Sequence, residues 1–409
     1  MRPIYLDYNA STPIDPAVAA IMRPLLESAY GNPSSAHWAG VPAKAALERA
    51  RAQVAALLGC AAEEIVFTSG GSEANNLALK GLFFRRRDRP AHIVTSRIEH
   101  PAILMPCRFL EHLGATVTYV PVDGTGRVDP DDIRKAVSGD TVLISIMHAN
   151  NEVGTIQPIA EIAKIARAHG IPFHTDAAQS AGKIPTNVDA LGVDLLSIAG
   201  HKLYGPKGIG ALYIRRGIVV EPLIHGAGHE LGRRAGTESA LLAAGLGEAC
   251  EIAQPGLGMP ATRRLRDLLW ERLSVELGER VSLNGHVHER LPNTLNVSFA
   301  GQVGAELLAQ MPEVAASTGS ACHAGRVELS PVLEAMGIAP EVGRGAIRFS
   351  LGRGTTEEEI EQVVDRVRRL LACAGRSPPV RSVRKSTRLG ARLCSAGSPR
   401  RSSSISSSS

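Results

Sequence analysis

Short apolar runs alternate with longer amphipathic stretches through the first half of the chain. The runs have the length, β-branched content and flanking turn residues of buried strands; they are EEIVFTSG, AHIVTSR, ATVTYVPV, TVLISIMHAN, IPFHTDAAQ, DLLSIAG and GALYIRR. The stretches between them, such as AKAALERARAQVAALLG and IAEIAKIARAHG, have helical periodicity. This alternation predicts an α/β fold with a mainly parallel sheet covered by helices.

The pattern changes after about residue 250. A long helical stretch, ATRRLRDLLWERLSVELG, precedes a short strand in NTLNVSFAG, and a helix is expected from Thr356 to about Leu371. We therefore predict a large domain over 13–249 and a smaller α+β domain formed by 1–12 and 250–372. Residues 373–409 are rich in Ser, Pro and Arg and are predicted to be a disordered basic tail.

Polar residues follow several predicted strands where a core would hold apolar ones. They occur at 68–72, 100, 150–151, 176–179 and 200–202. In parallel sheets ligands bind beyond the carboxyl ends of the strands, so these residues are expected to share one site.

Asp176 and Lys202 suggest the chemistry of that site. Each follows a predicted strand, in HTDAAQ and SIAGHKLYGPKG. An enzyme that uses pyridoxal 5'-phosphate (PLP) needs a lysine amine for the Schiff base and an acidic group beside the pyridinium nitrogen. Taken singly, the two residues could be a surface lysine and a helix-capping aspartate. Together, with His174, Gln179 and His201 nearby, they favour a PLP site.

Two further segments fit this hypothesis. TSGGSEANN lies between a strand and a helix, where exposed backbone N–H groups can hold a phosphate, although many strand–helix turns contain two glycines. His100, in SRIEHPAIL, could stack on a planar cofactor and shuttle protons, whereas a lone histidine is usually structural or solvated.

Cys322 lies among small residues in STGSACHAGRVELSP, which predicts a loop that leaves the thiol accessible. A reactive thiolate requires such an exposed setting, while most free cysteines are buried small hydrophobes. We interpret Cys322 as a nucleophile and Cys60, Cys107 and Cys250 as buried.

Composition and charge indicate which partners and which cellular compartment to expect. The net charge of +5 arises from the tail, which holds eight basic and no acidic residues, and the rest of the chain has 37 basic and 40 acidic residues. No nucleic-acid binding is therefore expected. No run of apolar residues is long enough for a membrane span, and no secretory signal is recognised. Six scattered cysteines without a disulfide framework indicate a reducing cytoplasm. No metal site is expected.

From about Ile4 to Leu371 the chain resembles NifS/IscS-type cysteine desulfurases, a class-V aminotransferase family of fold-type-I (aspartate-aminotransferase-like) PLP enzymes. The resemblance is carried by a set of motifs: YLDYNASTP, GNPSSAH, TSGGSEANNLALKG, EHPAI, HANNEVG, HTDAAQS, GHKLYGPKGIGALY, GTES, GSACHAG and RFSLGRGTT.

The resemblance implies a role for each matching residue. Lys202 matches the Schiff-base lysine, Asp176 the pyridinium partner and His100 the stacking histidine. Arg353 matches the arginine that binds the substrate carboxylate, and Cys322 the cysteine that forms the persulfide. Asn151 and Gln179 match the residues at the phenolic oxygen of the cofactor, and Asn151 also matches a residue near the substrate. The phosphate cradle is matched by Gly71, Ser72 and His201, together with Thr237 from a second subunit.

The sequence departs from the family at three places. Ala199 stands where many relatives have a serine hydroxyl on the phosphate, and Ser72 replaces a frequent threonine. His323 follows the nucleophile where IscS-type enzymes have a small hydroxylic residue, and an Ala-Cys-His run also resembles selenocysteine lyases.

The resulting hypothesis is a homodimeric cytoplasmic enzyme that converts L-cysteine to L-alanine. Its persulfide on Cys322 would pass to a sulfur-acceptor protein in iron–sulfur cluster assembly or thiolation. A selenocysteine lyase would share almost every residue. A PLP aminotransferase would have no use for Cys322, and a binding protein acting through its basic tail would need Lys202 to be incidental.

Overall fold

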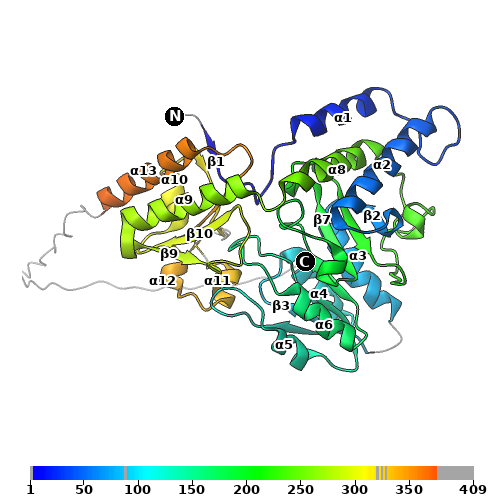
Figure 1. Ribbon diagram of the computed structural model, residues 1–409. Helices are drawn as coiled ribbons and strands as arrows, with labels where there is room; N and C mark the ends of the chain where they lie inside the picture. Colours follow the sequence, from blue (N-terminus) through cyan, green and yellow to red (C-terminus); the bar gives the residue numbers. More distant parts are fainter. Residues whose placement is uncertain (1–2, 87–89, 319–321, 324–325, 328, 375–409) are drawn as a thin grey trace, which may run out of the picture.

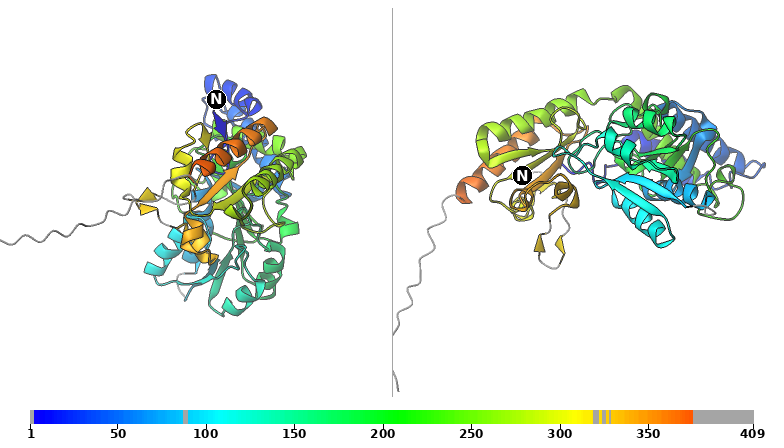
Figure 2. Two further views of the ribbon diagram at one scale, coloured as in Figure 1. Left: turned by 90° about the vertical axis from the view of Figure 1, so that its left-hand side faces the viewer. Right: turned by 90° about the horizontal axis from the view of Figure 1, so that it is seen from below.

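The computed structural model describes residues 3–86, 90–318, 322–323, 326–327 and 329–374. Two sheets lie side by side, each covered by its own set of helices (Figure 1). Figure 2 shows the same two bodies from two further directions. The predicted tail lies outside the described residues, apart from Cys373 and Ala374 at the end of the last helix.

A seven-stranded sheet forms the larger body, in the order β2-β8-β7-β6-β5-β3-β4. Neighbouring strands are parallel except for β8, which runs antiparallel to β2 and β7. The strands are β2 (Ile65–Thr68), β3 (His92–Ser96), β4 (Thr116–Val120), β5 (Thr141–Ser145), β6 (Phe173–Asp176), β7 (Leu195–Ala199) and β8 (Gly210–Ile214). Each of the seven predicted runs therefore forms a strand, and the mainly parallel α/β fold is confirmed.

Helices cover both faces of this sheet, which explains why its strands are apolar on both sides. One core unites the sheet with α1, α2, α5, α6 and α8, and a second core on the opposite face unites it with α3 and α4. The helices are α1 (Pro16–Glu27), α2 (Gly40–Leu58), α3 (Gly71–Arg85), α4 (Pro101–His112), α5 (Pro130–Ala136), α6 (Ile159–Ala168), α7 (Val188–Leu191) and α8 (Ala240–Ala253).

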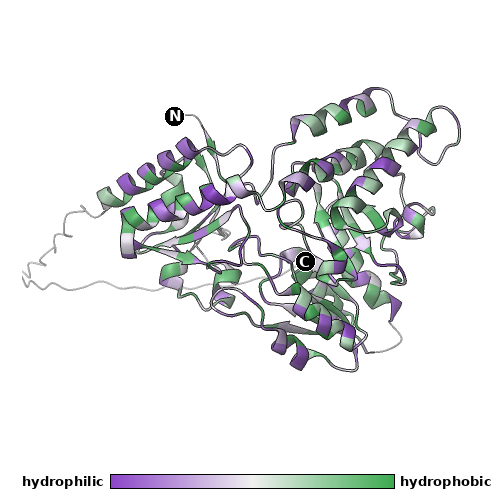
Figure 3. Cartoon of the chain, viewed as in Figure 1, coloured by the Kyte–Doolittle hydropathy of each residue, from purple (hydrophilic) through white to green (hydrophobic). Residues whose placement is uncertain are grey.

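The smaller body is built on an antiparallel sheet in the order β14-β10-β9. Leu265, Leu269 and Leu273, four residues apart on α9, pack into its core together with residues of α13. Figure 3 shows hydrophilic and hydrophobic residues alternating along both helices. The elements are β9 (Val281–Asn284), β10 (Thr294–Phe299), β14 (Ala346–Ser350), α9 (Pro260–Leu277), α10 (Gly304–Ala309), α11 (Pro331–Ala335), α12 (Pro340–Gly343) and α13 (Glu357–Ala374).

The N-terminal segment connects the two bodies. β1 (Ile4–Tyr5) pairs in parallel with β11 (Val314–Ala315) and belongs to the smaller body. The backbone N–H of Thr12 then donates to the carbonyl of His201 at 2.9 Å, beside the end of β7. The segment between them therefore spans the two bodies. The domain boundaries proposed from the sequence stay a prediction. No helix within the described ranges is long and apolar enough to cross a membrane.

Candidate active site

A cavity of about 590 Å³ opens at the carboxyl ends of the parallel strands. Its lining comes from the ends of β2, β3, β5, β6 and β7 and the segments that follow them, from the N-terminal segment, and from β14 of the smaller body. Eight of the residues singled out in the sequence line it: Gly71, Ser72, His100, Asn151, Asp176, Gln179, His201 and Lys202. The topology thus brings together groups separated by up to 131 residues, as expected for a site at the strand ends of an α/β sheet.

Asp176 is the last residue of β6 and is buried. Its Oδ1 accepts from the backbone N–H of Ala178 at 2.9 Å, and its Oδ2 accepts from Nδ2 of Asn75 at 2.7 Å. These two bonds fix the plane of the carboxylate. Oδ1 of Asn75, also on the cavity lining, is buried without a hydrogen-bond partner among the described residues. A buried polar atom of this kind requires a donor from water or a ligand.

Lys202 lies in the short 3₁₀ turn η2 (Gly200–Lys202) directly after β7. Its Nζ donates to the backbone carbonyls of Asn9 at 2.6 Å and Ala10 at 2.8 Å. Burial and the charge of Arg348 lower the pKa of this amine to about 8. A lysine with a lowered pKa is more often neutral near pH 7, so it can act as a nucleophile toward a carbonyl group.

His100 is the N-cap of α4, and its Nδ1 accepts from the backbone N–H of Ala102 at 3.1 Å. In the neutral ring the proton must therefore lie on Nε2. Burial lowers the pKa of His100, Asp176 opposes that shift and Lys202 adds to it. The cavity consequently contains a neutral imidazole of defined tautomer.

The N-terminus of α3 forms one end of the cavity, at Gly70, Gly71 and Ser72. Gly70 has φ +149°, which disfavours a side chain. A Cβ on Gly210 of β8 would lie 2.5 Å from the carbonyl oxygen of Ile198 and 2.7 Å from the carbonyl carbon of Gly70. The glycine loop therefore approaches the sheet closely. A helix leaves the N–H groups of its first turn without intrahelical partners, which is the usual setting for a phosphate.

His201 and Ala199 complete this end of the cavity. Burial and the charges of Lys202 and Lys207 lower the pKa of His201 to about 4, which leaves its ring neutral. A Cβ on Gly71 would lie 3.2 Å from the Cβ of Ala199, so the two positions are adjacent. Ala199 offers no hydroxyl there, and the departure noted in the sequence thus falls beside the glycine loop.

Thr237 lies outside this lining, in an adjoining cavity of about 200 Å³ that shares Ser69 and Gly208 with the first. The segment that carries Thr237 is tied to the first turn of α3, because Arg234 donates to Glu73 at 2.9 Å. The role expected for Thr237 involves a second subunit and stays a prediction.

The structure places Arg348, and not Arg353, on the cavity lining. Arg353 pairs with Asp15 at 3.4 Å and lies over the ring of Tyr204. Arg348 comes from the middle of β14; its side chain is 7% exposed, and its Nε has no partner among the described residues. Arg348 was not among the residues predicted from the sequence, although an arginine within the apolar run AIRFS was a usable signal, since buried charges are costly without a function.

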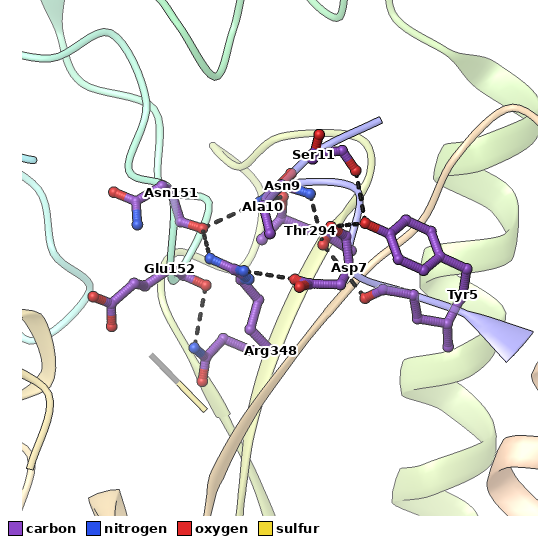
Figure 4. A network of polar contacts seen from close by, with 12 residues as sticks. Tyr5, Asp7, Asn9, Ala10, Ser11, Asn151, Glu152, Thr294 and Arg348 are labelled. Atoms are coloured by element: carbon purple, nitrogen blue, oxygen red, sulfur yellow. Dashed lines mark hydrogen bonds and ion pairs between the residues drawn. The ribbon is translucent and has the colours of Figure 1, made fainter. Parts of the chain in front are cut away.

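Asn9 was also missed. It bonds to the segments that follow β5, β6 and β7 and to β10, and Figure 4 shows it between Asn151 and Thr294. Its backbone carbonyl accepts from Lys202 and, at 3.0 Å, from Nε2 of Gln179. Its Nδ2 donates to Thr294 at 2.8 Å and to the carbonyl of Asn151 at 3.2 Å. Figure 4 also shows Arg348 between Asp7 and the Asn151 carbonyl.

The backbone of Cys322 belongs to β12 (Cys322–His323), which pairs with β13 (Arg326–Val327) in a small antiparallel hairpin. This hairpin stands apart from the sheet of the smaller body (Figure 2). The thiol lies outside the described part of the structure, so its role as nucleophile stays a prediction. Of the other cysteines, Cys107 and Cys250 are buried as expected, while Cys60 is only partly buried.

Comparisons with known proteins agree with this architecture. The family model "Aminotransferase class-V" matches residues 4–363. The cysteine desulfurase IscS of Dictyoglomus turgidum is 48% identical over 374 residues, covering 90% of this chain and 95% of that protein. IscS of Methanosarcina thermophila is 46% identical over 368 residues, covering 89% and 91%.

Solved structures give the same result. A NifS-like protein superposes with a TM-score of 0.84 at 37% identity, covering 91% of this chain and all of that one. SspA in complex with cysteine superposes with a TM-score of 0.75 at 41% identity, covering 85% and 98%. The chain therefore belongs to the class-V aminotransferase family and, within it, to the NifS/IscS-type cysteine desulfurases.

Proposed function

We propose that this enzyme is a PLP-dependent cysteine desulfurase that converts L-cysteine to L-alanine and retains the sulfur as a persulfide on Cys322. The observation that carries the proposal is a single cavity holding a lysine of lowered pKa, a buried carboxylate, a neutral imidazole and a glycine-rich helix N-terminus. These are the four groups that PLP requires.

The residues on the cavity lining fit the parts of PLP. Lys202 would hold the aldehyde carbon, Asp176 the pyridinium N–H, and His100 the face of the ring. Ser72 and His201, with the N–H groups of Gly71, would hold the phosphate, while Gln179 and Asn151 lie where the phenolic oxygen is expected. When bound, PLP supplies an electron sink for the bond that breaks at the substrate Cα.

The chain's own residues would orient the substrate and move its protons. Arg348 lines the cavity and Arg353 does not, and the buried Nε of Arg348 lacks a partner among the described residues, so we assign the substrate carboxylate to Arg348. Arginine suits this task because it can bind a carboxylate through two parallel N–H donors. The free amine of Lys202 and Nε2 of His100 are the groups within the cavity that would transfer protons.

The sulfur step would belong to Cys322. Its thiolate attacks the substrate sulfur, a sulfur–sulfur bond forms, and the carbon–sulfur bond breaks with its electron pair left on carbon. That carbon then takes up a proton, so cysteine and a thiol become alanine and a persulfide. We further propose that a sulfur-acceptor protein, for iron–sulfur cluster assembly or thiolation, removes the persulfide sulfur in the cytoplasm.

Borohydride reduction of the PLP-loaded enzyme followed by peptide mapping tests the assignment of Lys202. The pyridoxyl group is expected on Lys202, and Lys202→Ala should lose both the covalent label and turnover. Lys207, also on the cavity lining, and Lys183 are the competing amines. A label on either of them would overturn the assignment.

Selenocysteine is the competing substrate, and the curated relatives named cysteine desulfurase favour cysteine. Measuring alanine together with sulfide or selenide from the two amino acids decides between them. A turnover of selenocysteine without any turnover of cysteine would contradict the proposal.

We also propose that the enzyme is a homodimer in which Thr237 reaches the phosphate of the partner's site. The support is that Thr237 lies in a cavity adjoining the glycine loop and outside the main lining. Hybrid dimers of Lys202→Ala and Thr237→Ala chains provide the test. If sites are shared, one site of each hybrid carries both changes and the other carries neither, so the hybrid keeps about half the wild-type activity. Loss of activity in both sites would refute sharing.

A further inference from the structure

Lys183 is a buried lysine whose hydrogen-bond partners in the described part of the chain include no carboxylate. It lies in the turn after β6, its side chain is 4% exposed, and its Nζ donates to Oδ1 of Asn9 and to Oε1 of Gln179, each at 3.2 Å. None of the ion pairs between described residues includes it. Burying an amine that only amide oxygens satisfy is costly, so its retention calls for a function.

The bonding pattern at Gln179 indicates that function. An ammonium group can only donate, so the amide atom of Gln179 that faces Lys183 must be the oxygen. The amide nitrogen then faces the Asn9 carbonyl, an acceptor only, at 3.0 Å. Both neighbours therefore impose the same amide orientation. A primary amide has two N–H groups, and the second is left for the cavity that Gln179 lines.

Lys183 imposes the same constraint on Asn9. Oδ1 of Asn9 accepts from Lys183 and, at 3.0 Å, from Nδ2 of Asn293, so Nδ2 of Asn9 must turn toward Thr294. The backbone carbonyl of Asn9 is the group that holds Lys202. One buried amine thus sets the amide orientation of Gln179, a proposed cofactor-binding residue, and of Asn9, which contacts both Lys202 and Gln179.

We propose that Lys183 is a positioning residue that makes Gln179 a hydrogen-bond donor to the anionic ring oxygen of the bound cofactor, an inference that rests on the proposed function. Burial, with the charges of Lys202 and Arg348, lowers the pKa of Lys183 to about 7. Both the charged and the neutral amine have enough N–H groups to donate to Oδ1 of Asn9 and to Oε1 of Gln179. The orientation therefore persists on either side of neutral pH.

The test compares Lys183→Met with Lys164→Met, a matched change at an exposed lysine of α6. PLP is the probe, and the readouts are its dissociation constant and the pH midpoint of the change in its visible absorbance. Because the donor stabilises the oxygen anion, its loss raises the midpoint, by about one pH unit, and weakens binding roughly tenfold. The control variant should match the wild type. A wild type without a PLP absorbance band would instead refute the proposed function.

A double-mutant cycle with Gln179→Ala separates positioning from a general structural effect. If Lys183 acts through Gln179, Lys183→Met shifts the midpoint in the wild type and leaves it unchanged in the Gln179→Ala background. An equal shift in both backgrounds overturns the proposal, as does a lower melting temperature with no shift in either. If the methionine variant does not fold, Lys183→Gln, which retains one donor, is expected to show a smaller shift that again vanishes in Gln179→Ala.

Discussion

Replacing Arg348 by methionine should reduce kcat/KM for cysteine far more than the same change at Arg353. Arg348 is 7% exposed and is held by Asp7 at 2.7 Å and the Asn151 carbonyl at 2.9 Å. These two contacts hold the guanidinium at the cavity lining, where a substrate carboxylate would meet it. Two charge-assisted hydrogen bonds to a carboxylate contribute about 3–6 kcal/mol, so we expect a loss on the order of 10²–10⁴ in kcat/KM.

Arg353→Met is the control for Arg348→Met. Its side chain is 33% exposed, and an ion pair of this kind contributes less than about 1 kcal/mol, so Arg353→Met should cost less than about fivefold. Alanine production over a range of cysteine concentrations gives kcat/KM. Spectral titration with alanine, which keeps the carboxylate and lacks sulfur, isolates binding, and the PLP band and melting temperature report folding. If Arg353→Met loses a hundredfold while Arg348→Met stays within fivefold of wild type, the assignment is wrong.

Three further changes test other parts of the site. Cys322→Ala should keep the PLP band and lose cysteine turnover, and mass spectrometry of the wild type after one turnover without reductant should find the extra sulfur on the Cys322 peptide; sulfur on another cysteine contradicts the mechanism. Lys183 has a pKa near 7 in the folded state against 10.5 when unfolded, so the unfolded chain binds the additional proton and this group's contribution to stability rises with pH between those values. Between pH 7.5 and 9.5 the free energy of unfolding, measured with urea, should therefore rise less in Lys183→Met than in the wild type, by up to about 1.4 kcal/mol per pH unit. An equal rise in both proteins would refute the lowered pKa. Gly210→Ala places a Cβ 2.5 Å from the Ile198 carbonyl oxygen, so it should lower the free energy of unfolding by about 1–3 kcal/mol and weaken PLP binding. Gly139→Ala, whose Cβ would have nothing within 4 Å, should change neither quantity. Calorimetry measures the stability and PLP titration the binding.

The strands and the residues that follow them could be predicted because both leave local signals. A buried strand between two helical layers has an apolar run, and a polar residue directly after it, as at Asp176 or Lys202, has no packing explanation. The same logic locates His100 and the glycine loop. Their convergence follows from strand direction alone, since the carboxyl ends of parallel strands meet at one edge.

Residues that reach the cavity from the smaller body could not be placed in this way. Arg348 and Arg353 both occur in RFSLGRGTT, and which side chain faces the cavity depends on the pairing of β14 with β10 and on how the two bodies meet. Asn9 depends on the path of an irregular segment between the bodies. Lys183 could not be distinguished in the sequence from an ordinary lysine in a turn, because one of its two hydrogen-bond partners, Asn9, lies 174 positions away.

The contacts of Asn9 also bear on when the site can form during protein synthesis. Its backbone N–H donates to Ser350 Oγ, 341 residues later, and its amide to Thr294, 285 residues later. Ribosomes release the chain from its N-terminus, so the large sheet can fold while these partners are still missing. The carbonyl that holds Lys202 is then unanchored, and closing so long a loop is entropically costly. A nascent chain should thus complete the contacts of Asn9 beside Lys202 only after β14 has emerged.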